Sequence, residues 1–285
     1  MSKVCWMFPG QGGQSVGMGR ELYDDARGRA VFDEVDAAIG EKLSSVIFNG
    51  PAEDLDRPEI VQPAIFAVSM AMLAARDGAA ADFVVGHSLG EYSALCAAGC
   101  FSIADGAKLL RRRGELMASA VPAGLGAMAA IIGAVDIAAV CGEASAKAGG
   151  ICEPANFNSP GQVVISGNSD AIDAAVEIAK AAGAKIAKRL AVSVPAHCSL
   201  MAPAADGFRA VLDAVPFAAP KIPFVSNKTA EVMSDAAEIK DALVYQLTHG
   251  VRWTDCVLTL KRLGADDFVE VGPGAVLTGL VKRII

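Results

Sequence analysis

The sequence predicts an α/β protein in which a parallel-sheet core is interrupted by a small second domain. Short apolar runs alternate with stretches of helical period at both ends of the chain, which is typical of a parallel sheet. Between residues 123 and 194 the order of predicted elements becomes βαββαβ, the split-βαβ pattern. We therefore expect residues 1–122 and 195–285 to form the larger domain and residues 123–194 the smaller one.

Apolar runs and helix-ending residues define the elements of the first segment. Residues 4–8 form an apolar run that ends at Pro9-Gly10, and residues 81–85 form another that leads directly into Gly86, so both are predicted as buried strands. Helical periodicity predicts helices over residues 21–39, 64–76, 91–98 and 102–120. Pro122 ends the last of these helices, because proline cannot continue a helix from its interior.

The other two segments are divided in the same way. In the middle segment we expect strands at 128–132, 151–158, 162–166 and 185–194, and helices at 136–148 and 170–182. The turn signal Asn158-Ser-Pro-Gly161 joins the second and third of these strands. In the last segment we expect strands at 222–226 and 267–271, and helices at 201–214, 239–247, 254–263 and 277–284.

Composition excludes several classes of protein. The 285 residues carry 25 Lys and Arg against 32 Asp and Glu, a net charge of −7, which excludes a globally basic surface for nucleic acid. With 53% hydrophobic residues the chain can bury a sizeable core. The longest apolar stretch, residues 64–75, is too short to cross a bilayer, and the first ten residues do not resemble a signal peptide. We expect a soluble, cytoplasmic monomer with no nucleic-acid or membrane partner.

Cysteine usage indicates reduced thiols rather than bridges or metal ligands. The seven cysteines are an odd number, and no pair has the CxxC spacing. They stand at Cys5, Cys96, Cys100, Cys141, Cys152, Cys198 and Cys256. We expect buried thiols in a reducing compartment, and no metal site.

The segment Gly86-His-Ser-Leu-Gly90 matches G-x-S-x-G between a predicted strand and a predicted helix. That context predicts a nucleophile elbow, in which Ser88 is held out at the end of the strand. Glycines permit the strained turn, and the following helix N-terminus favours negative charge. The alternative is a helix-capping role, because Ser88 and Glu91 also match the S-x-x-E capping box. The flanking glycines and the preceding valines favour the elbow.

A serine nucleophile needs a base, and the chain has only three histidines. His87 adjoins Ser88 but is expected to point away from it, and His249 lies in a predicted loop. His197 lies where the chain re-enters the larger domain at a strand end, which is where active sites of open α/β sheets gather. No acid stands out as its partner: Asp206 and Asp255 are candidates only by position, and a backbone carbonyl can orient the ring instead.

Of three consecutive arginines, Arg113 is the one set among apolar residues. Its helical neighbours are Leu109, Leu110, Leu116 and Met117, whereas Arg111 and Arg112 lie on the polar side. An arginine inside an apolar arc needs an anionic partner, which is either a structural Asp or Glu or a substrate carboxylate. The glycine-rich loop at residues 10–13 lacks phosphate-loop spacing and is interpreted as part of an oxyanion hole.

Eight segments, in this order and spacing, together resemble the malonyl-CoA:acyl carrier protein transacylases, the free-standing acyltransferases of fatty acid synthesis. They are Phe8-Pro-Gly-Gln-Gly12, Val61-Gln-Pro-Ala64, Gly86-His-Ser-Leu-Gly-Glu-Tyr-Ser-Ala94, Arg113-Gly114, Asn156-Phe-Asn-Ser-Pro-Gly-Gln-Val-Val164, Val192-Ser-Val-Pro-Ala-His197, Gln246-Leu247 and Glu270-Val-Gly-Pro-Gly274. The resemblance implies an α/β-hydrolase-like core with an inserted ferredoxin-like domain. It also implies malonyl-CoA and acyl carrier protein as partners, with no metal or redox cofactor.

The resemblance assigns a role to each site residue. Ser88 is the nucleophile and His197 its base, oriented by the carbonyl of Gln246. The backbone amides of Gln11 and Leu89 form the oxyanion hole. The substrate-binding residues are Arg113, which grips the free malonyl carboxylate, Gln62, which lines the site, and Gln246.

The chain departs from the family pattern at two places, and three rival functions remain. His249-Gly250 stands where the family commonly has Asn-Pro, and Ala196 stands where it often has serine. The rivals are the same transfer serving polyketide synthesis, a serine esterase or thioesterase, and a non-enzymatic binder of carrier protein. A free carboxylate partner for Arg113 argues against the esterase, and the presence of both Ser88 and His197 argues against the binder.

Overall fold

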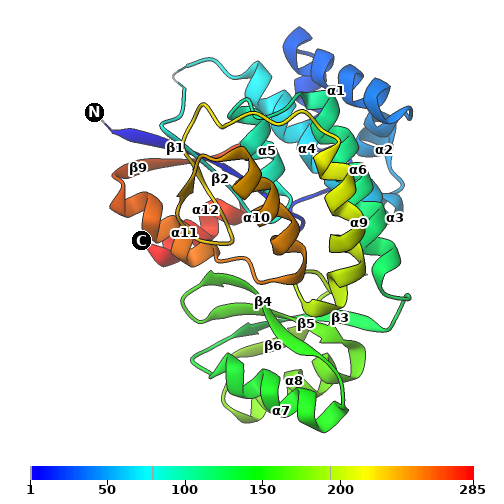
Figure 1. The fold of residues 1–285 in the computed structure, drawn as a ribbon, viewed down its shortest axis with the longest axis vertical. Coiled ribbons are helices and arrows are strands. Elements are labelled where there is room, and N and C mark those ends of the chain that lie inside the picture. Colours follow the sequence, from blue (N-terminus) through cyan, green and yellow to red (C-terminus); the bar gives the residue numbers. More distant parts are fainter. Residues whose placement is uncertain (1, 79, 193) are drawn as a thin grey trace.

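A five-stranded sheet in the order β8-β7-β2-β1-β9 forms the centre of the larger unit in the computed structural model, which describes residues 2–78, 80–192 and 194–285 (Figure 1). Four neighbouring strands are parallel: β1 (Lys3–Phe8), β2 (Phe83–Gly86), β7 (Phe224–Val225) and β9 (Ala265–Glu270). The short edge strand β8 (Val232–Met233) is antiparallel to β7. The predicted parallel-sheet α/β architecture is therefore confirmed.

Helices cover both faces of this sheet, as parallel sheets require. Successive residues of β1 point to opposite faces, so Trp6 and Phe8 enter one hydrophobic cluster while Cys5 and Met7 enter another. The first cluster lies under α1 (Ala26–Ile39), α4 (Pro58–Ala75), α5 (Gly90–Ala97), α6 (Ile103–Ala120), α9 (Ala202–Asp213) and α10 (Ala236–Thr248). The second lies under α11 (Trp253–Arg262) and α12 (Val276–Ile284).

Several elements of the larger unit differ from those expected. The helix predicted over residues 21–39 is broken into the 3₁₀ turn η1 (Arg20–Tyr23) and α1, because Asp25 caps α1 by accepting a hydrogen bond from the Arg27 amide. Two short helices, α2 (Leu43–Asn49) and α3 (Ala52–Leu55), and strand β8 were not predicted. A 3₁₀ turn, η2 (Ser199–Met201), begins the helix expected at 201–214.

Helix α4 begins six residues before the predicted start, with Pro58 at its first turn, where the missing amide hydrogen costs nothing. At 18 residues it is long and apolar enough to cross a membrane by those criteria alone, which corrects the estimate based on residues 64–75. However, 72% of this helix is buried inside the protein. Its apolar character is therefore explained by its place in the core.

The smaller unit is a four-stranded antiparallel sheet with two helices on one side. Its elements follow in the order β3 (Gly126–Ile132), α7 (Ile137–Ala148), β4 (Cys152–Ser159), β5 (Gln162–Asn168), α8 (Ser169–Ala181) and β6 (Ile186–Arg189), and its sheet order is β4-β5-β3-β6. A separate hydrophobic cluster fills the space between this sheet and its helices. Strand β6 ends at Arg189 rather than at the predicted residue 194, and Ser193 lies outside the described residues.

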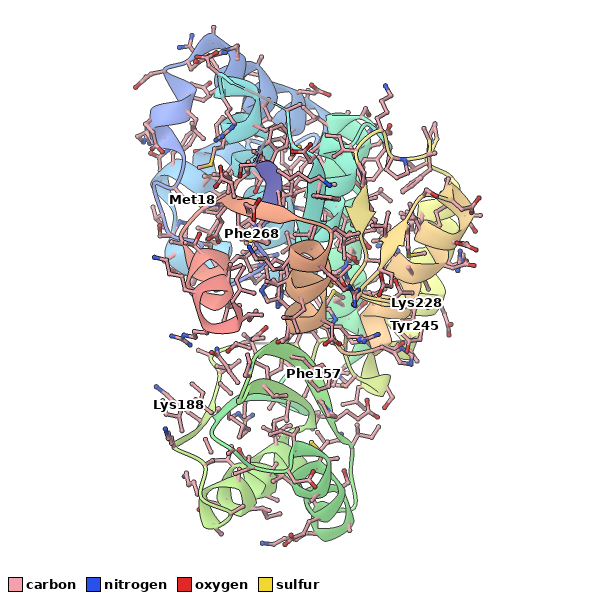
Figure 2. All side chains as sticks on the ribbon, turned by 90° about the vertical axis from the view of Figure 1, so that its left-hand side faces the viewer. Met18, Phe157, Lys188, Lys228, Tyr245 and Phe268 are labelled. Carbon is pink, nitrogen blue, oxygen red and sulfur yellow. The ribbon has the colours of Figure 1, made fainter. Side chains whose placement is uncertain are left out.

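The open face of the small sheet is turned toward the larger unit, while α7 and α8 lie on the far side (Figure 1). Strand β4 makes the junction: the Phe157 amide donates to the Val251 carbonyl at 2.9 Å, and Thr254 Oγ1 donates to the Phe157 carbonyl at 3.0 Å. Figure 2 shows Phe157 on the side of the small unit that faces the larger one. The space between the two units is where the site lies.

Candidate active site

Ser88 sits on a sharp turn between β2 and α5. Its φ of 54° lies in the left-handed region, which is strained for a residue with a side chain. A Cβ atom on Gly86 would lie 1.9 Å from the Gly90 carbonyl carbon, and one on Gly90 would lie 2.0 Å from the Phe8 carbonyl oxygen. Both positions therefore require glycine, and the backbone has the geometry of a nucleophile elbow.

The capping-box alternative is wrong for Ser88 and Glu91. Leu89, not Ser88, is the N-cap of α5, and no side-chain capping hydrogen bond is found at this helix start among the described residues. Ser88 Oγ lies 2.7 Å from His197 Nε2. The Glu91 side chain instead accepts hydrogen bonds from Asn227 and Gln246. The serine hydroxyl is thus directed at an imidazole rather than at the helix backbone.

His197 is buried and is held by a main-chain carbonyl rather than by an acid. Its Nδ1 lies 2.7 Å from the Gln246 carbonyl oxygen. Because a carbonyl can only accept, Nδ1 carries the hydrogen and Nε2 is left with a lone pair toward Ser88. Asp255 is ion-paired with Arg252 at 2.7 Å, and Asp206 is exposed, so neither of these acids is in contact with His197.

Burial, together with the positive charge of Arg113, lowers the pKa of His197 to about 3. The ring is therefore in its neutral, proton-accepting form throughout the physiological pH range. We expect ¹⁵N chemical shifts of the His197 ring to report a neutral imidazole at pH 5, where an ordinary histidine is only about 3% neutral. Titration followed by NMR, with the signal assigned by a His197→Gln variant, checks this; protonation near pH 6.5 would contradict it.

Arg113 is buried, with 1% of its surface exposed, and every partner in the described residues is neutral. Nη1 donates to Gln62 Oε1 at 2.7 Å, and Nη2 donates to Gln246 Oε1 at 3.0 Å and to Ser88 Oγ at 3.3 Å. No carboxylate of residues 2–78, 80–192 or 194–285 forms an ion pair with it, and its Nε has no hydrogen-bond partner there. Burying a guanidinium without a counter-ion is costly, so this arrangement favours an anionic ligand.

The remaining residues predicted at the site are Gln11, Leu89 and Gln62. Gln11 lines the cavity at the end of β1, beside the elbow. The amide nitrogens of Gln11 and Leu89 donate no hydrogen bond to any described residue, as an oxyanion hole requires before substrate arrives. Gln62, Arg113 and Gln246 are not among the described residues that line the cavity; Gln62 is fully buried, and its Oε1 accepts a hydrogen bond from Arg113 Nη1.

A cavity of about 380 Å³ leads from the junction of the two units to Ser88 and His197. Its walls come from both units and are largely apolar. They include Met117 and Leu280 of the larger unit, and Met128 and Val164 of the smaller unit. A cavity of this size accommodates a small acyl chain with its thioester arm.

Sequence reasoning missed Asn227, whose side chain hydrogen-bonds to the backbone of the turn that carries Ser88. Asn227 Oδ1 accepts from the Ser88 amide at 3.0 Å, and Nδ2 donates to the Gly86 carbonyl at 2.8 Å. Its position just after β7, at the carboxyl end of a parallel strand, was the available signal. His87 points away from Ser88, as expected, and bonds to Asn158 Oδ1 at 2.9 Å across the junction.

Comparison with known proteins decides the family. Residues 5–284 match the family model of the acyl transferase domain. The chain belongs to the acyl transferase domain family. The resemblance seen in the sequence is thereby confirmed.

This acyl transferase is similar along its whole length to curated relatives named malonyl CoA-acyl carrier protein transacylase. The relative from Bacillus subtilis is 46% identical, covering 100% of this chain and 91% of the relative. The relative from Escherichia coli K12 is also 46% identical, covering 100% and 94%. The similarity therefore extends across both units.

Solved structures of malonyl-transferring enzymes have a similar fold. The acyl-carrier-protein S-malonyltransferase of Burkholderia pseudomallei has a TM-score of 0.96 and 46% identity, covering 99% of this chain and 93% of that one. A malonyl-transacylase solved in complex with its type II PKS acyl-carrier protein has a TM-score of 0.96 and 43% identity, covering 100% and 93%.

All seven cysteines of this acyl transferase are free thiols, and all except the half-buried Cys96 are buried. Within the described ranges no group of three or more His, Cys, Asp or Glu side chains is placed to hold a metal ion.

Proposed function

We propose that this acyl transferase moves the malonyl group from malonyl-CoA to the phosphopantetheine thiol of acyl carrier protein, through a malonyl ester on Ser88, and so supplies extender units for fatty acid synthesis. The observation that carries the proposal is the buried Arg113, which lies 3.3 Å from Ser88 Oγ and has no anionic partner among the described residues. A malonyl group on Ser88 carries its free carboxylate next to this guanidinium. The Nε and Nη2 edge matches a carboxylate bidentately.

In the first half-reaction Ser88 Oγ attacks the thioester carbonyl while its proton passes to His197 Nε2, 2.7 Å away. The resulting oxyanion is stabilised by the Gln11 and Leu89 amides. The C–S bond then breaks, and the leaving CoA sulfur takes the proton from His197.

In the second half-reaction the carrier thiol gives its proton to His197 and attacks the ester carbonyl. The C–O bond breaks, and Ser88 Oγ recovers the proton. Gln246 supports both steps, because its carbonyl holds the imidazole and its side-chain oxygen holds Arg113. The pKa of His197 is lowered by burial and by the positive charge of Arg113. A malonyl carboxylate bound to Arg113 offsets that charge, so it raises the pKa of His197 and makes the imidazole a stronger base.

The larger unit, residues 1–122 and 195–285, is proposed to be an α/β-hydrolase-like catalytic domain, and residues 123–194 a ferredoxin-like domain, which their element order and separate core support. We propose a cytoplasmic monomer that acts without a metal or redox cofactor. The full-length similarity to malonyl CoA-acyl carrier protein transacylases supports the assigned substrates.

The rival functions differ in what accepts the acyl group. A malonyl-transacylase of similar fold was solved with a polyketide acyl-carrier protein, so transfer to a polyketide carrier is the nearest alternative. The activity is the same, and the genes beside this one distinguish the pathways. A serine esterase would instead release the acyl group to water.

Intact-mass measurement in two steps tests the proposed function. Malonyl-CoA alone should add one malonyl group to the protein. Addition of holo acyl carrier protein should then remove the adduct and transfer its mass to the carrier. Apo carrier protein, which lacks the thiol, is the matched control. Loss of the adduct as free malonate at the same rate with either carrier form would identify an esterase instead.

A further inference from the structure

Glu91 is a buried carboxyl group beside the site that the mechanism above does not use. It lies in the first turn of α5, three residues after Ser88, and is fully buried. Its Oε1 accepts from the Asn227 amide at 2.6 Å, and its Oε2 accepts from Gln246 Nε2. Both oxygens thus face donors, one of them a backbone amide that cannot change its role. Burial raises the pKa of Glu91 to about 8, and the two donors that face its oxygens favour the ionised form.

The contact with Glu91 bears on which way the Gln246 amide faces. Gln246 Nε2 points at acceptors, Glu91 Oε2 and the Ser88 carbonyl at 3.0 Å, while its Oε1 accepts from Arg113 Nη2 at 3.0 Å. A reversed amide would set its oxygen against these acceptors and its NH₂ group against the guanidinium. The orientation of the Gln246 amide is therefore determined by the donors and acceptors that surround it.

We propose that Glu91 is a positioning residue for substrate selection: through Gln246 it keeps an acceptor on Arg113, and so holds the guanidinium in line for the free carboxylate of the acyl group on Ser88. This inference rests on the proposed function and deepens it. The chain of contacts runs from Glu91 through the Gln246 amide to Arg113, and all three side chains are at most 2% exposed. A buried chain of this kind transmits a change at one end because its members have no water to replace a lost partner.

The substitution Glu91→Gln keeps the size and shape of the side chain but replaces one acceptor oxygen with an NH₂ donor. The new amide must turn its oxygen to the Asn227 N–H, so its NH₂ group meets the NH₂ group of Gln246. If Gln246 reverses in response, it loses its bond to the Ser88 carbonyl and presents a donor to Arg113. Every arrangement of the two amides leaves at least one mismatched contact, so Gln246 is no longer held in the single orientation that gives Arg113 an acceptor.

A through-space role for the Glu91 charge makes the opposite prediction. If Glu91 acted only as a counter-charge for Arg113, neutralising it would increase the attraction of Arg113 for a substrate carboxylate. The preference for malonyl over acetyl would then rise. If Glu91 positions Arg113, the preference falls, so the sign of the change separates the two roles.

The test compares kcat/KM for malonyl-CoA and acetyl-CoA in wild type, Glu91→Gln, Arg113→Ala and the double variant. We expect Glu91→Gln to lower the malonyl value on the order of tenfold and to leave the acetyl value nearly unchanged. In the Arg113→Ala background the same substitution should change the malonyl value less than about twofold, because nothing is left to position. Gln246→Met, which removes the amide from the middle of the chain, should reproduce the loss of preference even if Glu91→Gln folds poorly.

A preference that stays the same or rises in Glu91→Gln, an equal loss in both backgrounds, or a wild-type preference in Gln246→Met would each overturn the inference. Failure of the proposed function gives a different result, since the wild type itself would then show no preference for malonyl.

Discussion

Arg113→Ala is expected to lower kcat/KM for malonyl-CoA by about 10³-fold while acetyl transfer holds or rises. The substitution removes the only buried cation beside Ser88 in the described structure, and with it the attraction for the malonyl carboxylate. It also removes the penalty for leaving that cation unpaired with an acetyl group. Arg113 is one cause of the lowered pKa of His197, so its loss makes the base stronger for either thioester. Steady-state kinetics with both substrates measure the effect.

Arg113→Lys is the matched control, because it keeps the charge and loses the planar fork. We expect poor rescue of malonyl transfer, since a compact ammonium cannot make the bidentate contact with a carboxylate that a planar guanidinium makes while it also donates to two glutamine oxygens. A fall of malonyl and acetyl activity by the same factor in Arg113→Ala would make Arg113 a structural residue. It would also remove the main physical support for a malonyl substrate.

Ser88→Ala is expected to abolish the covalent adduct and to reduce transfer by on the order of 10⁶-fold, and His197→Ala should reduce it about as far, because the two act as a unit. Ser88 Oγ and His197 Nε2 are 2.7 Å apart, so neither performs the proton transfer without the other. Ser88→Ala keeps the elbow, since its amide still bonds to Asn227. Mass spectrometry after malonyl-CoA treatment checks the adduct, and an adduct that persists in Ser88→Ala would refute the assignment.

Local signals in the sequence were enough for most of the fold. The strand at residues 4–8, the elbow and the helix begun by Ser102 were predicted within a few residues, because apolar runs, glycines and caps act over short distances. The helix over residues 21–39 was wrong because Asp25 caps a new helix where periodicity alone continues. The early start of α4 at Pro58 was missed because its first turn is defined by packing as well as by sequence.

The site was predictable only where one residue carries its own signal. Arg113 could be singled out by its helical angle among leucines, and the structure buries it. The contacts of Asn227 with Ser88 and with Glu91 could not be predicted from the sequence, because the paired residues lie 139 and 136 positions apart. The contact of Gln62 with Arg113 could not be predicted either, because the partners of a residue on a buried helix depend on tertiary packing.

A competition in the wild-type protein tests most directly whether Arg113 selects a free carboxylate for transfer through Ser88. The protein is mixed with equal amounts of malonyl-CoA and acetyl-CoA, quenched within one turnover, and its peptides are mapped by mass. We expect a malonyl adduct on the peptide that contains Ser88, in excess over the acetyl adduct by a factor that approaches about 10⁴. Equal amounts of the two adducts, or a malonyl adduct on another peptide, would contradict it.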